Sequence, residues 1–385
     1  MEPEHWVTAK LQAATDQHRQ GRLAEAEVLY REILAAEPQD FHALNRLGIL
    51  KYQQGQLDAA HDLLVEAVAR NPQSDRALSN LATVLLARKD LTAALAACQK
   101  ALALRPDEPD IHFNRAHILM ELKRYEDALA GYDRALELRP DDAQALAARG
   151  KALMLLDRPL EAATSFASVL EKSPGDADMW VNYASVLIAV NRYEDAIPGF
   201  QRALELRPDY GPALMGLGKA QLALKRFEEA AACYDSLLAR APDSLEALGS
   251  RGMALLNLGR AADALVTFDR ALTLSPNDPA ALFGRGCALD RLGRTGDALA
   301  SVDRLLERYP RHAGVLRTRM KLLCDVSRFD EALACSDRLL DLDSKDASAL
   351  VARASILLEL RRPGEALLFL EQALEARPKI GRAHV

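Results

Sequence analysis

Six arginines are the residues of this 385-residue chain whose spacing is most suggestive of chemistry, because they recur at one interval or at multiples of it. They are Arg115, Arg149, Arg251, Arg285, Arg319 and Arg353. A row of guanidinium groups could bind an acidic ligand, since each group can hold a carboxylate through two parallel hydrogen bonds. The alternative is structural, because five of the six arginines have an acidic residue at the same distance after them, as Arg115 has Asp133.

These five arginines favour the structural interpretation. A charge that faces a contact between helices is costly unless an opposite charge pairs with it. We therefore predict five ion pairs, each inside one repeated segment of the chain: Arg115–Asp133, Arg251–Asp269, Arg285–Asp303, Arg319–Asp337 and Arg353–Glu371. Arg149 has Ala167 at the corresponding place, so its partner should come from a neighbouring segment.

The histidines and cysteines form no catalytic or metal-binding pattern. Eight histidines are scattered, and the spacing of His112 and His117 does not stack side chains on one face of a helix. The five cysteines include no C-x-x-C, which argues against a zinc site or a disulfide framework and agrees with a reducing compartment. No phosphate-binding glycine loop or G-x-S-x-G occurs. We expect no enzymatic activity, no metal and no cofactor in these residues.

The charge balance restricts the class of partner. Lysine and arginine number 49 against 55 acidic residues, a net charge of −6. This mild acidity argues against general binding to nucleic acid or anionic membranes, which need a basic surface. No apolar run approaches the roughly 20 residues that span a bilayer, and the first residues lack a secretory signal. We expect a cytoplasmic protein whose partner is a protein or peptide.

One repeat, of constant length, organises the whole chain. Its markers are evenly spaced prolines at positions 38, 72, 106, 140, 174, 208, 242, 276, 310 and 378, with Ser344 in place of the remaining one. With the proline at position 32 of each repeat, the eleven repeats are 7–40, 41–74, 75–108, 109–142, 143–176, 177–210, 211–244, 245–278, 279–312, 313–346 and 347–380, and residues 1–6 form a tail. An alanine stands at position 20 of every repeat, from Ala26 to Ala366.

Each repeat has the pattern of two helices. Apolar or small residues at positions 4, 7, 8 and 11 form one helical stripe, and positions 20, 24 and 27 form a second. Between the stripes lie residues that tolerate a left-handed backbone, namely Gly21, Gly55, Asn191, Gly259 and Gly293. The sequence therefore predicts an all-α fold of eleven helix-turn-helix units. Pro198 should disturb its helix, whereas Pro159 and Pro363 fall at helix starts.

The residues of the sixth repeat resemble a known family. W-x-x-Y-A, from Trp180 to Ala184, is followed by Ala196, Phe200, Ala203 and Pro208, a pattern similar to the tetratricopeptide repeat. The resemblance covers residues 7–380. It implies a right-handed superhelical solenoid whose first helices line a concave groove for other proteins, and therefore a non-catalytic interaction scaffold.

In this family, position 6 of the first helix faces the groove. Asparagine occupies it in three repeats, as Asn80, Asn114 and Asn182. An amide is both donor and acceptor, so spaced asparagines could bind the backbone of an extended peptide whatever its sequence. Their alternative role is plain surface solvation. Lysine at position 5 and asparagine at position 9, which clamp a C-terminal carboxylate in chaperone-binding members, do not occur here.

An enzymatic alternative remains open. The asparagines resemble those of the repeat domain of O-linked N-acetylglucosamine transferase, and Ala14–Leu34 resembles the start of bacterial repeat proteins, some of which carry a glycosyltransferase. Residues 380–385 read as the translation of a common sequencing adapter, so we expect a fragment with an artefactual tail at 381–385. An uncapped last helix could also allow self-association.

Overall fold

The computed structural model describes residues 3–376 and shows 22 helices and no strand among them. The chain divides into two compact units, residues 1–191 and 192–385. The helices of the first unit are α1 (Pro3–Arg19), α2 (Leu23–Ala36), α3 (Phe41–Gln53), α4 (Leu57–Arg70), α5 (Asp75–Ala87), α6 (Leu91–Leu104), α7 (Pro109–Glu121), α8 (Tyr125–Leu138), α9 (Ala143–Leu155), α10 (Pro159–Lys172) and α11 (Ala177–Ala189).

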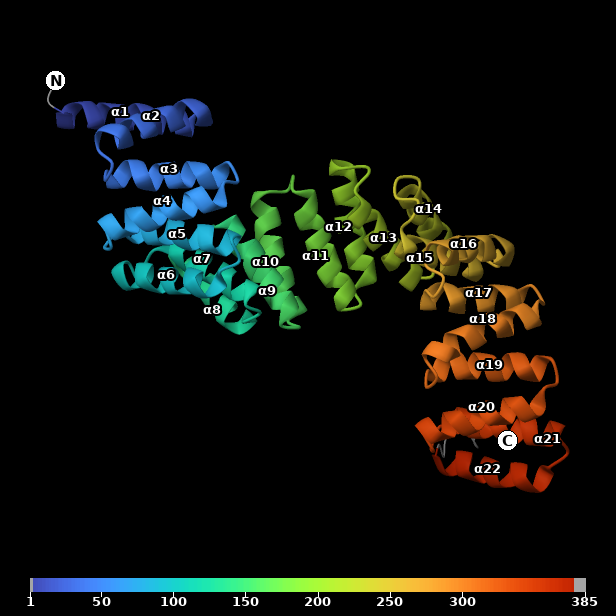
Figure 1. Cartoon of the computed structure of the whole chain (residues 1–385). Helices are drawn as coiled ribbons and strands as arrows, with labels where there is room; N and C mark the ends of the chain where they lie inside the picture. The colour runs from blue at the N-terminus through green and yellow to red at the C-terminus, as the bar shows by residue number, and fades with distance from the viewer. Residues whose placement is uncertain (1–2, 377–385) are drawn as a thin grey trace. The chain divides into compact units, whose positions relative to one another are not determined.

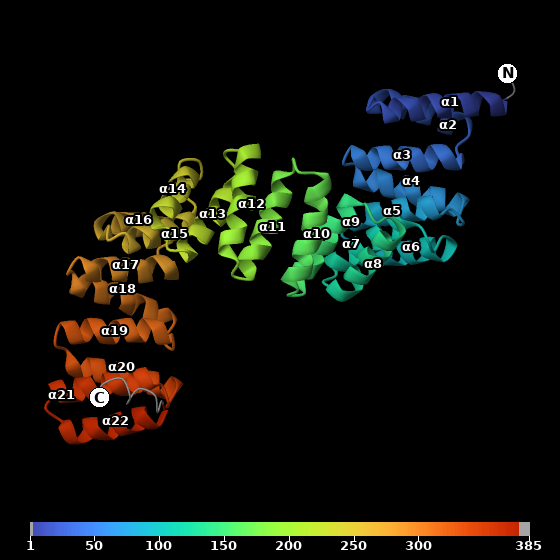
Figure 2. The ribbon, with the colours of Figure 1, turned by 180° about the vertical axis from the view of Figure 1, so that it is seen from behind.

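The second unit continues the same alternation of helices. Its helices are α12 (Tyr193–Leu206), α13 (Gly211–Ala223), α14 (Phe227–Leu238), α15 (Leu245–Asn257), α16 (Ala261–Leu274), α17 (Pro279–Arg291), α18 (Thr295–Arg308), α19 (Ala313–Asp325), α20 (Phe329–Leu342), α21 (Ala347–Glu359) and α22 (Pro363–Ala376). Within each unit, successive helices lie side by side as antiparallel pairs (Figure 1, Figure 2). The predicted all-α fold of helix-turn-helix repeats is confirmed.

The helix boundaries follow from local sequence. From α3 to α21, each first helix begins at position 1 of a repeat, and a side chain at the preceding position often caps it. Asp40, for example, accepts a hydrogen bond from the Ala43 amide, and Asp278 accepts one from Ala281. Helix α1 begins at Pro3, inside the segment 1–6 that was predicted as a tail. Val7 is buried with Ile33 and Ala43, and this contact anchors the start of the helix.

A left-handed residue ends the first helix of every repeat. The five predicted turn residues all have positive φ, and so do the residues at the same position of the other six repeats. Those six are Lys89, Lys123, Asp157, Lys225, Ser327 and Arg361. A turn of constant geometry therefore joins the helices even where the residue is not glycine or asparagine.

Small residues allow the two helices of a repeat to approach closely. The alanines at position 20 are completely buried in ten repeats, and Ala366 is 1% exposed. Position 8 packs against the large residue at position 24 of the same repeat. A Cβ atom added to Gly150 would lie 2.5 Å from the ring of Phe166, and one added to Gly252 would lie 2.5 Å from Phe268. These contacts require glycine at those positions.

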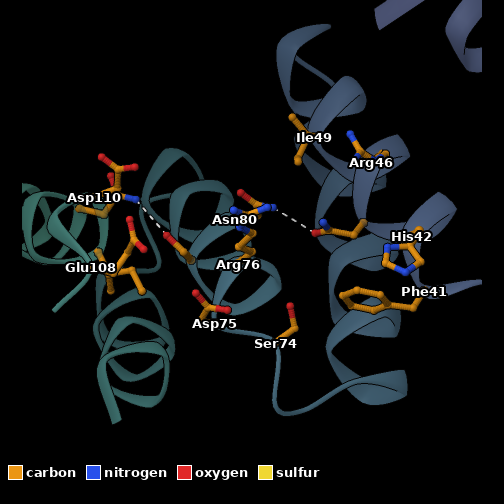
Figure 3. Close-up of a pocket in the computed structure, with 14 residues that line it drawn as sticks. Phe41, His42, Arg46, Ile49, Ser74, Asp75, Arg76, Asn80, Glu108 and Asp110 are labelled. Atoms are coloured by element: carbon orange, nitrogen blue, oxygen red, sulfur yellow. Dashed lines mark hydrogen bonds between the residues drawn. The ribbon is translucent and has the colours of Figure 1, made fainter. Parts of the chain in front are cut away.

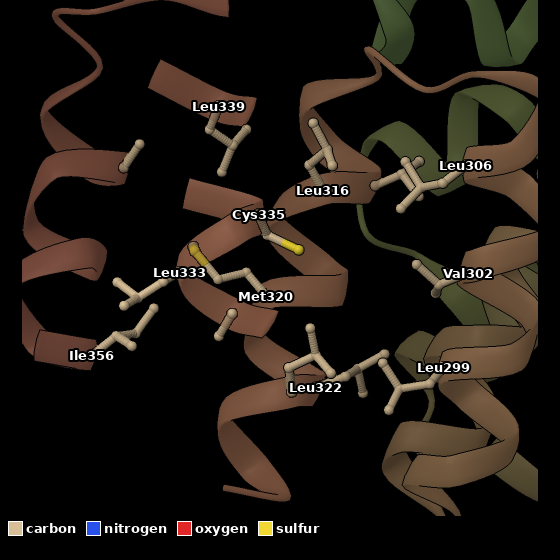
Figure 4. Close-up of a cluster of buried hydrophobic side chains, with 14 of the residues drawn as sticks. Leu299, Val302, Leu306, Leu316, Met320, Leu322, Leu333, Cys335, Leu339 and Ile356 are labelled. Atoms are coloured by element: carbon tan, nitrogen blue, oxygen red, sulfur yellow. The ribbon is translucent and has the colours of Figure 1, made fainter. Parts of the chain in front are cut away.

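The core continues from one repeat to the next within a unit. In the second unit, a buried cluster extends from Leu282 on α17 to Ala366 on α22. Figure 4 shows part of it, with Val302, Met320 and Leu333 pointing between neighbouring helices. Each helix pair thus buries its apolar face against adjacent repeats, as expected of a solenoid.

Two of the three prolines singled out in the sequence lie where a helix tolerates them. Pro159 and Pro363 are the first residues of α10 and α22. Pro198 lies inside α12, which continues to Leu206. Since proline has no amide hydrogen, the Glu194 carbonyl lacks its usual helical donor there.

Two further sequence predictions concern membranes and the C-terminal end. No helix among residues 3–376 is long and apolar enough to cross a membrane. The predicted tail at 381–385 lies outside the described residues.

Candidate functional site

Five of the six arginines at position 7 form ion pairs, but not the predicted ones. Each pairs with the acid at position 25 of the preceding repeat instead of the acid at position 25 of its own repeat. The Nε atom of Arg285 lies 2.7 Å from Asp269 Oδ1, and that of Arg319 lies 2.6 Å from Asp303 Oδ1. The complete set is Arg149–Asp133, Arg251–Asp235, Arg285–Asp269, Arg319–Asp303 and Arg353–Asp337.

All five predicted pairings within a repeat are therefore wrong, and helix geometry explains why. Positions 7 and 8 point about 100° apart around the helix. Position 8 faces the second helix of its own repeat, as Gly252 does toward Phe268. Position 7 therefore turns toward the second helix of the preceding repeat. The expectation that Arg149 would find its partner in a neighbouring repeat is confirmed, because it pairs with Asp133.

A second contact holds several of these arginines to their own repeat. Arg285 Nη1 donates to Ser301 Oγ at 2.6 Å, and Arg251 Nη1 donates to Thr267 Oγ1 at 2.7 Å. Both hydroxyl groups are at position 23. In the last repeat, position 23 is Phe369, and the Arg353 guanidinium lies 4.6 Å from the centre of its ring. These arginines join adjacent repeats, and each already has an acidic partner inside the protein.

Two members of the predicted set have no ion partner among the described residues. Arg115 has Gln99 at position 25 of the preceding repeat, and its predicted partner Asp133 pairs with Arg149. Arg115 lies near the buried Cys98 thiol. Burial raises the pKa of Cys98 to about 12, although the positive charge of Arg115 opposes the rise. Glu371, the predicted partner of Arg353, is exposed on α22.

A polar hollow in the first unit is the candidate binding site (Figure 3). It has a volume of about 700 Å³. The residues that line it come from α3, α5 and α7 and from the positions just before α5 and α7. They are Phe41, His42, Asn45, Arg46, Ile49, Ser74, Asp75, Arg76, Ser79, Asn80, Glu108, Asp110, Ile111 and Asn114. We call this hollow the groove of repeats 2–4. No second helix contributes a side chain to it, as the family resemblance implies.

Two of the three predicted asparagines line this groove. Asn80 Nδ2 donates to Asn45 Oδ1 at 3.0 Å, and Asn114 Nδ2 donates to Ser79 Oγ at 3.1 Å. In each bond, position 6 of one repeat is held by position 5 of the repeat before it. The amide oxygens of Asn80 and Asn114 accept no hydrogen bond from any described residue. Both amides are therefore oriented with an acceptor left for a ligand.

Asn182 and Asn45 depart from the prediction in opposite ways. Asn182 is half-buried on α11 and does not line the groove of repeats 2–4. Asn45 lines it but was missed, because it stands at position 5, and the adjacent Arg46 occupies position 6. The sequence did contain a signal for Asn45, namely a polar residue 35 positions before the asparagine at position 6. Asn45 and Asn80 have this separation, and so do Ser79 and Asn114.

The acidic residues of the groove already have arginine partners. Asp75 lies 3.2 Å from Arg105 Nε, and Glu108 lies 3.0 Å from Nη1 of the same arginine. Asp110 lies 2.8 Å from Arg139 Nη1. Neither Arg105 nor Arg139 is among the residues that line the groove. The carboxylates therefore turn to arginines at the groove's margin.

The second unit has a hollow of about 550 Å³, lined by residues of α19 and α21 and by the first residue of α20. Met320, Phe329 and Ile356 give it an apolar wall. At its edge, Lys321 donates to Asp290 at 2.8 Å and to Asp325 at 3.1 Å, and these bonds raise the lysine pKa, mainly through Asp290. Unlike the groove of repeats 2–4, this hollow has its lysine neutralised within the protein.

The five cysteines are free thiols with limited exposure to solvent. Cys98 and Cys335 are buried, and the other three cysteines are half-buried, all as free thiols. Burial raises the pKa of Cys233 to about 11 and also raises those of Cys287 and Cys324. Such thiols carry little thiolate at neutral pH. No three metal-ligating side chains come together among the described residues.

Comparison with known proteins identifies the type of repeat. One tetratricopeptide repeat profile matches residues 11–60, 45–109, 181–244, 216–279 and 321–379. The chain belongs to the tetratricopeptide repeat family. Two further profiles of the family match residues 85–152 and 280–312. Proteins of this family generally mediate protein–protein interactions, and a fold made only of these repeats is typically non-catalytic. Among curated proteins, none matches the chain.

Several solved structures are similar to this chain. One chain in the structure of the APC/C hetero-tetramer Cut9–Hcn1 is 14% identical to this protein. The match covers 98% of this chain and 94% of that chain, with a TM-score of 0.47. A tetratricopeptide repeat protein from Parabacteroides merdae is 21% identical over 65% of this chain and 99% of that one, with a TM-score of 0.48. YrrB, described as a tetratricopeptide repeat protein with an unusual peptide-binding site, is 25% identical. The match covers 49% of this chain and 97% of YrrB, with a TM-score of 0.44.

Proposed function

We propose that the protein is a non-catalytic cytoplasmic scaffold that binds an extended peptide in the groove of repeats 2–4. The observation that carries the proposal is the pair of oriented amides on α5 and α7. Asn80 and Asn114 are each held by the preceding repeat and keep an amide oxygen available. Two such oxygens on adjacent first helices can accept hydrogen bonds from the backbone N–H groups of one extended segment.

Pre-orientation is what distinguishes these amides from ordinary surface asparagines. A free asparagine loses side-chain entropy when it binds, whereas Asn80 and Asn114 are already ordered by their bonds to Asn45 and Ser79. The groove is also large enough, at about 700 Å³, for several residues of a peptide. Contacts to the backbone give affinity without demanding a particular sequence, which suits a scaffold.

Selection from a random peptide library tests this function. We expect the wild-type chain to enrich binders whose affinity falls about tenfold or more in Asn80→Ala/Asn114→Ala, since two hydrogen bonds of roughly 1 kcal/mol are lost. Asn182→Ala is the matched control, because Asn182 occupies the same repeat position outside the groove. Equal losses in the control, or binders that ignore both asparagines, would refute the proposal.

The enzymatic alternative is the repeat portion of a bacterial glycosyltransferase similar to O-linked N-acetylglucosamine transferase. It shares its support with the scaffold proposal, because both rest on asparagines at position 6. No described feature favours it over the scaffold, and a glycosyltransferase domain encoded in frame beyond residue 385 would be the observation that does.

A further inference from the structure

The groove of repeats 2–4 contains two arginines whose charge is not neutralised. Arg46 lies on α3 and Arg76 on α5, and both line the groove (Figure 3). Among residues 3–376, no carboxylate pairs with either one. This contrasts with the arginines at position 7 in repeats 5 and 8–11, which all have acidic partners.

The acidic residues nearby do not supply the missing counter-charge. Asp75 and Glu108 both pair with Arg105, and Asp110 pairs with Arg139. Arg46 does lie near the hydroxyl of Tyr30, whose pKa is raised by burial while Arg46 opposes the rise. A phenol with a raised pKa is neutral at pH 7, so it leaves the charge of Arg46 uncompensated. Arg46 and Arg76 are therefore the arginines of the groove that form no ion pair among the described residues.

The two arginines flank the amides proposed to hold the peptide backbone. Arg76 and Asn80 lie one helical turn apart on α5, so the two side chains share one face of that helix. Arg46 follows Asn45, which accepts the hydrogen bond from Asn80. In an extended segment, side chains alternate on either side of the backbone. A backbone bonded to Asn80 therefore directs its neighbouring side chains toward guanidinium groups.

We propose that this groove is selective for peptides that carry aspartate or glutamate side chains. This inference rests on the proposed function and names the class of peptide. Arginine matches a carboxylate with a planar pair of donors, and opposite charges across an interface give specificity and faster association. Arg46 and Arg76 are thus the specificity-determining residues, and Asn80 and Asn114 provide the contacts to the backbone.

The experiment uses the full chain and peptides with an acetylated N-terminus and an amidated C-terminus, so that no terminal carboxylate contributes. We expect random-library selection to enrich acidic residues. Replacing glutamate by glutamine in a selected peptide should weaken binding about tenfold at low salt and less at about 0.5 M salt, because salt screens exposed charges. In Arg46→Gln/Arg76→Gln, the two peptides should bind equally well.

A matched control separates groove charge from net charge. Arg22→Gln/Lys100→Gln removes the same total charge from exposed positions of the same unit, and neither residue lines the groove. This variant should keep the preference for glutamate. Charge reversal, Arg46→Glu/Arg76→Glu, should shift selection to lysine-rich peptides.

The possible failures are distinguishable. If selected peptides are neutral or basic yet depend on Asn80 and Asn114, the acidic specificity is wrong and the proposed function stands. If the control loses the preference as strongly as Arg46→Gln/Arg76→Gln, the effect is one of net charge, and the role of the two arginines is refuted. If no selected peptide depends on the two asparagines, the proposed function itself fails.

Discussion

Position 6 of the first helix serves different purposes in the two units. In the first unit, Asn80 and Asn114 line a polar hollow. In the second unit, Gly216 and Gly284 occupy the same position and are buried against the preceding repeat. A Cβ atom there would lie 2.2 Å from the ring of Phe200 or Phe268. One position can therefore face a ligand or form part of the packing.

The preceding repeat determines which purpose is possible. Leu64 and Cys98, at position 24 of the repeats before Asn80 and Asn114, are smaller than a phenyl ring. Phe200 and Phe268 instead reach the next first helix. An aromatic residue alone is not sufficient, since Phe166 contacts Gly150 of its own repeat and is followed by Asn182. An aromatic ring at position 24 therefore does not by itself exclude a side chain at position 6 of the next repeat.

The largest effect should come from Phe268, because its ring fills the space between Gly252 and Gly284. Phe268→Ala removes a completely buried ring and should destabilise the second unit by about 3–5 kcal/mol. Urea unfolding followed by circular dichroism measures this loss. Val266→Ala, on the same helix but 70% exposed, should change stability by less than about 0.5 kcal/mol. Equal effects would show that Phe268 does not join the two repeats.

A paired substitution of glycines tests the packing role of position 6 directly. Gly284→Ala places a methyl group against Phe268 and should cost about 1–3 kcal/mol. Gly249→Ala meets nothing within 4 Å and should stabilise α15 by up to about 1 kcal/mol through helix propensity. Thermal unfolding should move in opposite directions for the two variants, and a shared direction would contradict the comparison.

The register of the arginine pairs can be tested by a double-mutant cycle. Arg319 and Asp303 should show a coupling energy of about 1 kcal/mol, reduced by the 47% exposure of the aspartate side chain. Arg319 and Asp337, the pair within one repeat, should show almost none. A larger coupling for Arg319 with Asp337 would restore the prediction that the structure overturned.

In the first unit, the ion pair formed by Glu27 and Lys51 should make the stability of the protein depend on pH in the acid range. The hydrogen bond from Lys51, which is 5% exposed, is the largest cause of the lowered pKa of Glu27. A lowered carboxyl pKa adds stability above its ordinary value near 4.5, and that stability is lost as pH falls through the folded value. Urea unfolding should show that Glu27→Gln lowers stability at pH 7 by about 1 kcal/mol but much less at pH 3.

The smallest effect concerns the turns, which are alike in both units. Lys225 has a φ of 61°, a conformation that suits glycine better than a residue with a side chain. Lys225→Gly should therefore stabilise the second unit by about 0.5 kcal/mol, because relief of strain exceeds the added chain entropy. A lower melting temperature would show that the lysine side chain contributes more than its backbone strain costs.

Much of the fold could be predicted from single residues. The alanines at position 20 and the left-handed turn residues depend on local geometry, so their recurrence once per repeat is sufficient evidence. Part of the groove could be predicted in the same way, through Asn80 and Asn114. Asn45 and the arginines Arg46 and Arg76 were missed, because their role depends on side chains from three different repeats.

The arginine pairs show where a repeated sequence becomes ambiguous. Some consecutive repeats all carry an arginine at position 7 and an acid at position 25. Each arginine there has an acid at position 25 of its own repeat and another at position 25 of the preceding repeat. Two exceptions agree only with pairing between repeats: Arg149 lacks an acid in its own repeat, and Asp235 has Leu217 in place of an arginine. Arg115 points the other way, because it has Asp133 in its own repeat and Gln99 in the preceding one. The sequence alone therefore left the register open.

The sequence by itself determined the period, the helix pairs, the turns and the small residues at helix contacts, because each depends on the chain's local geometry. Tertiary structure alone decided which repeat supplies each arginine's partner, which asparagines meet in one groove and which charges remain unpaired. These outcomes depend on which neighbouring helix a side chain faces. A shift of one position along a helix turns the side chain by about 100°, toward a different neighbour.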